Sequence, residues 1–211
     1  MKKHPASQAQ SPDLSSLSQV DLSPRHAVMF AAAQKTCGGN KTWRYRKLAE
    51  VREIFALAQI SRLQVIWLDL AADLRVELLM RVTVPLMPRP GGTLTLADTA
   101  RLGLIYREEC LLLPQPGYSF VQILAPHPVW HPNVSPDPAQ VLCLGPKLAA
   151  GIPVRELLLM IYGALTMQNT QLDPADSAGV LSPASAEYFQ RNLNLIPLSR
   201  EPFLRTGADN I

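Results

Sequence analysis

Cysteine is scarce in this sequence, and its few copies form no recognisable pattern. Three cysteines, Cys37, Cys110 and Cys143, are spread over 211 residues, and no CxxC pair occurs. The odd number argues against a disulfide framework, and the lack of close pairs argues against a cysteine-rich zinc site. Free thiols persist in a reducing compartment, so we expect a cytoplasmic protein. We expect Cys37 to be exposed beside its glycines and Cys110 to lie on a strand in the core.

Long apolar runs and a strong excess of one charge are also missing. The longest helical apolar stretch, LLLMIYGAL, is far shorter than the roughly 20 residues that span a membrane. No apolar run follows the basic N-terminal residues, so no secretory signal is predicted. The formal net charge is only +3 and no Lys/Arg block is longer than MKK. We therefore expect neither a nucleic acid nor a membrane as a partner.

Composition and periodicity divide the chain into an extension, a domain and a tail. Residues 1–42 begin with a Ser-, Gln- and Pro-rich stretch, which predicts disorder, and continue with a short helical segment at 26–35 and the breaker TCGGNK. The domain is expected over 43–192. Residues 193–211 carry two prolines and little periodicity, as is typical of a tail.

The first segment of the expected domain has helical periodicity, with apolar residues on one face and basic residues on the other. The apolar residues are Leu48, Val51, Ile54, Phe55 and Ala58. The basic residues are Arg44, Arg46, Lys47 and Arg52. This basic face is either a docking surface for a partner protein or an ordinary solvated face.

Four strand-like segments and two further helices follow. The strand-like segments are 63–70, 74–84, a third within 97–114, and 118–126. Because turns link them in sequence and Pro85 ends the second, they predict an antiparallel meander. The helix after Pro153 should be buried along one apolar stripe. The stripe consists of Val154, Leu157, Leu158, Ile161 and Leu165. Ser182 as N-cap and Pro183 at the first position predict the last helix, so the class is α+β.

The segment HPNVSPDPAQVLCLG, at 131–145, lies between the expected sheet and the buried helix. A cysteine in such an irregular region can be presented as a nucleophile, and Asn133 is a neutral amide that could polarise a carbonyl. A lone cysteine in an apolar run is more often a core residue, and Asn133 could only cap a turn. A metal site built from Cys143, His127 and His131 is an alternative without a fixed short spacing to support it.

The residues around this segment match a known pattern. PVWHPNV followed by VLCLG resembles the signature of the ubiquitin-conjugating enzymes, in which an apolar or aromatic residue and His-Pro-Asn precede a short loop and an apolar-Cys-Leu segment. LPQPGYSFVQILAP is similar to that family's proline-tyrosine turn and next strand, and SPASAEYFQRN to its helix beginning Asn-Pro-Glu-Ala-Ala. The resemblance covers 43–192. It implies a ubiquitin-conjugating-enzyme-like fold with an N-terminal helix, a four-stranded antiparallel meander, a crossing helix and a shortened C-terminal helix.

The resemblance also implies a role for each residue of the segment. Cys143 would receive the C-terminal carboxyl of a ubiquitin-like protein as a thioester from an activating enzyme, and would pass it to an amine of a protein target. Asn133 would stabilise the oxyanion of that transfer or support the active-site loop. His131 and Pro132 would order the loop, the proline by fixing φ.

Other parts of the chain receive roles from the same resemblance. An acidic residue past the crossing helix would orient the incoming lysine, with Asp176 as the better placed candidate and Asp173 as its rival. The basic first helix would meet the activating enzyme and any ligase. The chemistry would need no metal and no organic cofactor, because the activating enzyme consumes the ATP.

The sequence departs from the family at several places. SPDPAQ lengthens the gap between Asn133 and Cys143, Gly145 stands where an acidic residue is common, and GPKLAAGIP replaces a tryptophan-proline segment. These departures favour a divergent branch, such as those of bacterial ubiquitin-like conjugation operons, some of which serve antiphage defence. One alternative is a non-catalytic module of the same fold that binds or scaffolds a ubiquitin-like protein. Another is a stand-alone cysteine hydrolase, which needs a histidine beside Cys143.

Overall fold

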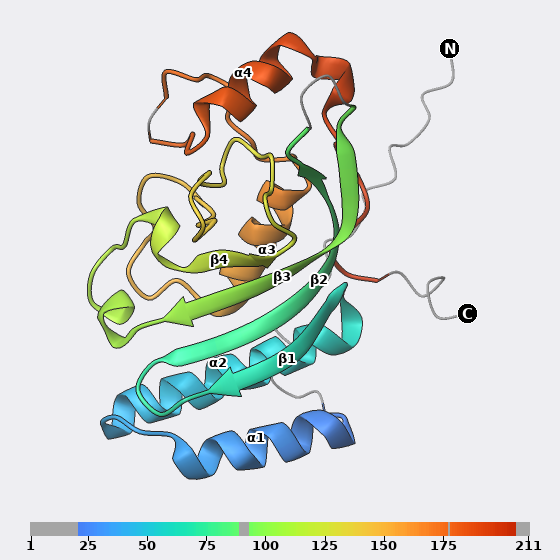
Figure 1. The fold of residues 1–211 in the computed structure, drawn as a ribbon. Coiled ribbons are helices and arrows are strands. Elements are labelled where there is room, and N and C mark those ends of the chain that lie inside the picture. The colour runs from blue at the N-terminus through green and yellow to red at the C-terminus, as the bar shows by residue number, and fades with distance from the viewer. Residues whose placement is uncertain (1–20, 89–92, 177, 206–211) are drawn as a thin grey trace, which may run out of the picture.

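The computed structural model describes residues 21–88, 93–176 and 178–205. It is the predicted α+β protein, in which a helix pair precedes a four-stranded antiparallel sheet and further helices follow (Figure 1). The strand order β1-β2-β3-β4 is that of a meander. The disorder expected for residues 1–20 falls outside the described residues. The helices are α1 (Pro24–Thr36), α2 (Lys41–Ile60), α3 (Val154–Leu165) and α4 (Pro183–Arg191), the strands are β1 (Leu63–Asp69), β2 (Leu74–Leu86), β3 (Thr95–Tyr106) and β4 (Val121–Ala125), and the 3-10 turns are η2 (Glu108–Leu111), η3 (Gly117–Ser119) and η4 (Leu193–Leu195).

The first helix, α1, packs on α2 and β1 as part of the same core as the domain. Its N-terminus is capped by Ser23, whose hydroxyl accepts a hydrogen bond from the His26 amide at 3.3 Å. The His26 ring stacks on Phe55 of α2 at 4.5 Å, and Phe30 is buried. Cys37, expected to be exposed, is buried directly after α1. The glycines beside Cys37 indicate a loop, and loop residues are usually exposed. Cys37 is buried because it directly follows α1, which packs on the core.

The strands differ from the predicted segments mainly at their ends. β2 runs through Pro85 to Leu86 instead of ending before the proline. β1 pairs with β2 only as far as Met80, so the lack of an amide hydrogen at Pro85 breaks no pairing with β1. β3 ends at Tyr106, and Cys110 is therefore buried in η2 and not on a strand. Burial raises the pKa of the Cys110 thiol.

The crossing helix α3 has the predicted stripe, because all five of its residues are fully buried. Pro153, which precedes α3, offers no side-chain cap. A carboxylate from α2 takes that place: Glu50 accepts a hydrogen bond from the Val154 amide at 2.9 Å. Glu50 in turn pairs with Arg46 at 2.6 Å, and Arg46 donates to the Gly151 carbonyl at 3.1 Å. Arg46 is thus engaged in holding α3 and is only half-exposed, in contrast to the expected free basic face.

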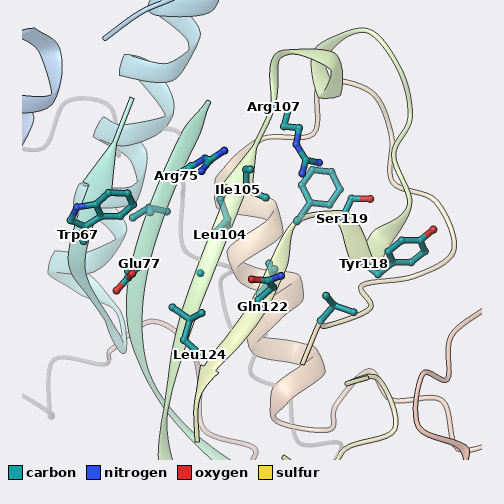
Figure 2. A pocket seen from close by; sticks show the side chains of 15 residues that line it. Trp67, Arg75, Glu77, Leu104, Ile105, Arg107, Tyr118, Ser119, Gln122 and Leu124 are labelled. Carbon is teal, nitrogen blue, oxygen red and sulfur yellow. The ribbon is translucent and has the colours of Figure 1, made fainter. Parts of the chain in front are cut away.

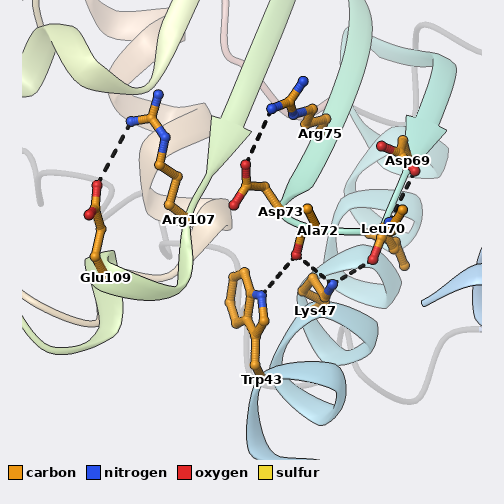
Figure 3. Close-up of polar contacts among 10 residues, drawn as sticks. Trp43, Lys47, Asp69, Leu70, Ala72, Asp73, Arg75, Arg107 and Glu109 are labelled. Atoms are coloured by element: carbon orange, nitrogen blue, oxygen red, sulfur yellow. Dashed lines mark hydrogen bonds and ion pairs between the residues drawn. The ribbon is translucent and has the colours of Figure 1, made fainter. Parts of the chain in front are cut away.

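The sequence predicts Lys47 on the outer, basic face of α2. In the structure Lys47 is fully buried. Its ammonium donates to the carbonyl oxygens of Leu70 and Ala72, and it lies 5.3 Å from the centre of the Trp43 ring (Figure 3). The Trp43 indole donates to the same Ala72 carbonyl at 3.1 Å. The acceptors are backbone oxygens of the turn between β1 and β2, so Lys47 ties this turn to α2. A partner protein cannot reach Lys47.

Candidate functional site

The His-Pro-Asn segment joins the end of the sheet to α3 and α4. His131 is fully buried and its Nε2 lies 3.0 Å from the Ala164 carbonyl of α3, while its Nδ1 accepts from the Asn133 amide at 3.1 Å. A neutral ring protonated at Nε2 satisfies both contacts. Burial lowers the pKa of His131 to about 4, which keeps the ring neutral near pH 7. These are the contacts of a histidine that orders a loop.

Pro132 fixes the other side of this segment. Its carbonyl accepts hydrogen bonds from the amides of Leu181 and Ser182, both at 2.9 Å. Ser182 and Pro183 begin α4 as predicted, although among the described residues the Ser182 side chain makes no capping hydrogen bond. The His-Pro-Asn backbone therefore anchors the entry into α4.

The segment SPDPAQ, at 135–140, folds into a tight hairpin between Asn133 and Cys143. The Ser135 amide donates to the Val141 carbonyl at 2.9 Å, and the Gln140 amide donates to the Asp137 carbonyl at 3.0 Å. Only the tip, 136–139, is exposed. The hairpin therefore brings the two ends of the segment side by side.

Gln140 is buried at the base of this hairpin. Its Oε1 accepts from the Val129 amide at 2.7 Å, and its Nε2 donates to the carbonyls of Ile123 and Pro126 at 3.0 and 2.9 Å. One amide side chain thus satisfies three backbone groups of the segment that leads into His-Pro-Asn. A glutamine at the end of a proline-rich loop carries no sequence signal for such a role.

Asn133 and Cys143 are neighbours across the hairpin. The Cys143 amide donates to the Asn133 carbonyl at 2.8 Å, and Asn133 Nδ2 lies 3.5 Å from the Cys143 carbonyl. Asn133 Oδ1 is buried and has no hydrogen-bond partner within the described ranges. An unpaired buried acceptor is costly, and a catalytic role, a water molecule or an ion is among the explanations for one.

Cys143 as a whole residue is 1% exposed. Its Sγ lies 3.5 Å from the Gly145 carbonyl and 3.7 Å from the Ala178 carbonyl, both within reach of a thiol donor. Beside it is a cavity of about 180 Å³ that Asn133 also lines. The other lining residues are Leu144, Gly145, Met160, Ala164, Asn169, Gln171 and Gly179. The thiol is thus closed by the 178–179 backbone but adjoins a small cavity that contains amide groups.

The two candidate aspartates are in the loop that covers the thiol, and they differ in position. Asp176 is half-buried, its Oδ1 accepts from the Ala178 amide at 3.0 Å, and its Oδ2 accepts from Gln171 at 3.1 Å. Gln171 and the neighbouring Gly179 both line the cavity. Asp173 is exposed, and its Oδ1 accepts from the Ala175 amide at 3.0 Å. Asp176 is therefore linked to the cavity wall through its side chain, whereas the Asp173 carboxylate caps its own turn.

Two of the four basic residues expected to dock a partner remain accessible. Arg44 is exposed and lines, with Lys41 and Tyr45, a hollow of about 430 Å³. Arg52 is exposed too, but its guanidinium lies 5.1 Å from the centre of the Phe30 ring of α1. The basic surface on α2 is thus smaller than the sequence predicts.

A larger hollow, of about 480 Å³, lies on the outer face of the sheet. Figure 2 shows Trp67 from β1, Glu77 from β2 and Leu124 from β4 on the side of the strands turned away from α3. Tyr118 of η3 closes one end. Cys143 does not line this hollow, so the hollow is distinct from the candidate site.

Other chemistries find little support in the part of the chain that the structure describes. Cys143 Sγ has no histidine partner there, and both nitrogens of His131 are occupied by backbone groups. The geometry that a cysteine hydrolase requires is therefore missing from these residues. No group of three or more His, Cys, Asp or Glu side chains among them could hold a metal ion. None of the described helices is both long and apolar enough to cross a membrane.

Comparison with known proteins adds no assignment. The chain matches no protein-family model, and neither a curated protein nor a solved structure is significantly similar to it.

Proposed function

We propose that this chain is a divergent ubiquitin-conjugating enzyme with a ubiquitin-conjugating-enzyme-like fold, which carries a ubiquitin-like protein as a thioester on Cys143. The order of elements supports the fold: α2, the meander, the His-Pro-Asn segment, the cysteine, α3 and a short α4 follow one another as in that family. The departures in sequence fit a branch of bacterial conjugation pathways, including those of antiphage defence.

The observation that carries the proposal is the pairing of Asn133 with Cys143 beside one cavity. Despite the inserted hairpin, the Cys143 amide is hydrogen-bonded to the Asn133 carbonyl at 2.8 Å. The Asn133 side chain lines the same cavity as the thiol. An amide donor next to an acyl-carrying sulfur can stabilise the oxyanion that forms when the acyl carbon is attacked.

The transfer would proceed in two steps. In the first, Cys143 Sγ bonds to the acyl carbon of the modifier, the bond to the sulfur of the activating enzyme breaks, and the thiol proton passes to the departing sulfur. In the second, the neutral amine nitrogen of the target bonds to the same carbon, the bond to Cys143 Sγ breaks, and one proton of that nitrogen ends on the sulfur. Asn133 Nδ2, with one hydrogen directed at the Cys143 carbonyl, has a second hydrogen for the oxyanion.

A chemically activated donor tests the first step without the activating enzyme. The protein is incubated with two mercaptoethanesulfonate thioesters, one of ubiquitin and one of acetyl-Gly-Gly, and examined on non-reducing gels and by mass spectrometry. We expect an adduct that has the mass of the acylated protein, is removed when an excess of thiol takes over the acyl group by thiol–thioester exchange, and is absent from Cys143→Ala. Cys110→Ala, which removes another buried cysteine, is the matched control and should still form it. If neither donor gives an adduct, or if the adduct survives Cys143→Ala, the proposal is wrong.

A second candidate function is a non-catalytic module of the same fold that binds a ubiquitin-like protein. The observation in its favour is the closure of the thiol, since Cys143 is 1% exposed and the Ala178 carbonyl lies 3.7 Å from Sγ. This function predicts binding of ubiquitin or a related modifier that is equally strong in the wild type and Cys143→Ala, with no thioester from either donor.

A further inference from the structure

Arginines that lie far apart in the sequence meet on the outer face of the sheet. Side chains alternate between the two faces of a strand, so Arg75, Glu77 and Arg81 of β2 share one face. Arg101 of β3 lies on the same face, because its Nε donates to Glu77 Oε2 at 3.1 Å. Arg107 follows β3 and lines the hollow of about 480 Å³ at the same end as Arg75 (Figure 2). Arg101 and Glu77 neutralise each other, which leaves an excess of three arginines.

These three arginines are available to a ligand. Arg75 lies 3.4 Å from Asp73 and Arg107 lies 4.0 Å from Glu109, and both arginine side chains are about half exposed (Figure 3). Exposed ion pairs of this kind contribute little to stability, so a phosphate can take the place of the carboxylate. Arg81 is exposed and pairs with no acid of the described ranges. The outer face thus offers guanidinium groups to an anion.

Two aromatic rings stand on opposite sides of the same hollow. Trp67 of β1 is 47% exposed, and Tyr118 of η3, which directly precedes β4, is 51% exposed. Because β1 and β4 are the two edge strands, the rings are separated by the width of the sheet, about 14 Å for three strand spacings. Gly103 of β3, which is paired with Glu77, adds no side chain between them. The rings therefore flank a floor that is open to an extended ligand.

The arginines and the aromatic rings together select the chemistry of the ligand. Guanidinium groups favour phosphate, and exposed aromatic rings stack with nucleic-acid bases. A single-stranded polynucleotide offers phosphates and accessible bases along one chain, whereas a duplex hides its bases in the stack. By analogy, a common RNA-binding module also uses a four-stranded sheet with exposed aromatic residues to bind single strands. The outer face therefore favours single-stranded nucleic acid over other anions.

We propose that the outer face of the sheet binds a single-stranded polynucleotide. Trp67 and Tyr118 stack on bases, and Arg75, Arg81 and Arg107 contact phosphates. This binding is separate from the proposed thioester chemistry, because the cysteine does not line the hollow. It also departs from the expectation of no nucleic-acid partner, which rests on the net charge of +3 and the lack of Lys/Arg blocks. Neither measure detects arginines that strand alternation gathers on one face.

Fluorescence anisotropy of fluorescein-labelled oligouridine and oligodeoxythymidine measures the binding at several KCl concentrations, with a DNA duplex of the same length for comparison. Stacking and phosphate contacts are common to RNA and DNA, so we expect both single strands to bind, with a Kd of about 10⁻⁴–10⁻⁶ M. The duplex should bind more weakly, because its bases cannot stack on the rings. Three phosphate contacts predict a slope of about −2 when the logarithm of the binding constant is plotted against that of the salt concentration.

Four variants separate stacking from charge. Trp67→Ala should weaken binding by about fivefold or more and keep the salt slope, since it removes one stacked base. Arg75→Gln should make the slope shallower by about 0.7, the share of one phosphate contact. Tyr45→Ala and Arg44→Gln are the matched controls, because they change an exposed aromatic residue and an exposed arginine on α2. Both controls should bind as the wild type does, and all four variants should keep its midpoint of urea unfolding.

Each contrary result overturns the inference. If neither single strand binds at low salt, the outer face takes no polynucleotide. Wild-type affinity in Trp67→Ala would mean an unspecific attraction of charges, and an equal loss in Tyr45→Ala would place the site on α2. Labelled ubiquitin that binds only when Trp67 is present, while the oligonucleotides do not bind, would assign the face to a protein partner. None of these results bears on the Cys143 thioester, which the activated donors test separately.

Discussion

Replacement of His131 by glutamine should make the stability of this protein less dependent on pH. The ring is fully buried, bonded to the Ala164 carbonyl and the Asn133 amide, and its pKa falls from 6.5 to about 4 because burial disfavours the charged form. In the unfolded chain the same histidine binds a proton already near pH 6.5. The unfolded state therefore binds more protons between these two values, and the free energy of unfolding rises with pH there.

The size of the effect follows from the two pKa values. One pH unit corresponds to about 1.4 kcal/mol, so the drop from 6.5 to about 4 is equivalent to about 3 kcal/mol. This stability is fully present above pH 6.5, is lost as the pH falls towards 4, and changes no further below that. Because a domain has only about 5–15 kcal/mol in total, the loss should be easy to measure.

Urea unfolding at pH values from 7.5 to 4 measures it. We expect the wild type to lose about 3 kcal/mol more than His131→Gln over this range, because the variant lacks the titrating ring. His127→Gln removes an exposed histidine and serves as the matched control. Subtracting the curve of His131→Gln from that of the wild type removes the contribution of the carboxylates, which titrate in both proteins. Parallel curves for the wild type and His131→Gln would show that the buried, neutral ring does not control this dependence.

Three further substitutions test the internal contacts by urea unfolding at pH 7. Lys47→Ala should lower the free energy of unfolding by about 2–3 kcal/mol, because it leaves the Leu70 carbonyl without a donor and opens a cavity. Arg44→Ala, on the surface of the same helix, is the control and should lower it by under about 0.5 kcal/mol. Similar losses in the two variants would contradict the burial of Lys47. Glu50→Ala should cost about 2 kcal/mol by removing the cap of α3, and an unchanged midpoint would mean that α3 needs no such cap. Gln140→Ala should cost about 3 kcal/mol, because three backbone groups lose their partner, whereas a loss below 1 kcal/mol would indicate that water replaces the side chain.

The elements were predictable because periodicity reports burial directly. The stripe of α3 and the Ser182–Pro183 start of α4 depend on residues close in sequence, and both were found where the pattern indicated. The prediction that Lys47 is exposed is wrong, because the carbonyl oxygens that accept its hydrogen bonds belong to the turn after β1, more than twenty residues away. A helical pattern shows which face a lysine is on, but it cannot show that distant carbonyl oxygens accept hydrogen bonds from its ammonium.

The candidate site was predictable only in part, for the same reason. The proximity of Asn133 to Cys143 follows from their short separation in sequence along a hairpin. The closure of the thiol by the Ala178 carbonyl and the contact between Gln171 and Asp176 both depend on how the loop after α3 folds back. That loop has no periodicity, and its turns are formed by aspartates that cap neighbouring amides.

Gly145 bears on the choice between the two candidate functions. Under the proposed function, a glycine at a position where the family that the chain resembles commonly has an acidic residue would favour a non-catalytic module. However, Gly145 has a φ of +127°, a conformation that residues with a Cβ rarely adopt. Its carbonyl accepts from the Gly117 amide at 3.1 Å and lies 3.5 Å from Cys143 Sγ. A Cβ on Gly117 would come within 2.1 Å of that carbonyl. A side chain at 117 would clash with this carbonyl, and an acidic side chain at 145 would be strained by the positive φ. The glycine at 145 therefore does not count against a thioester on Cys143.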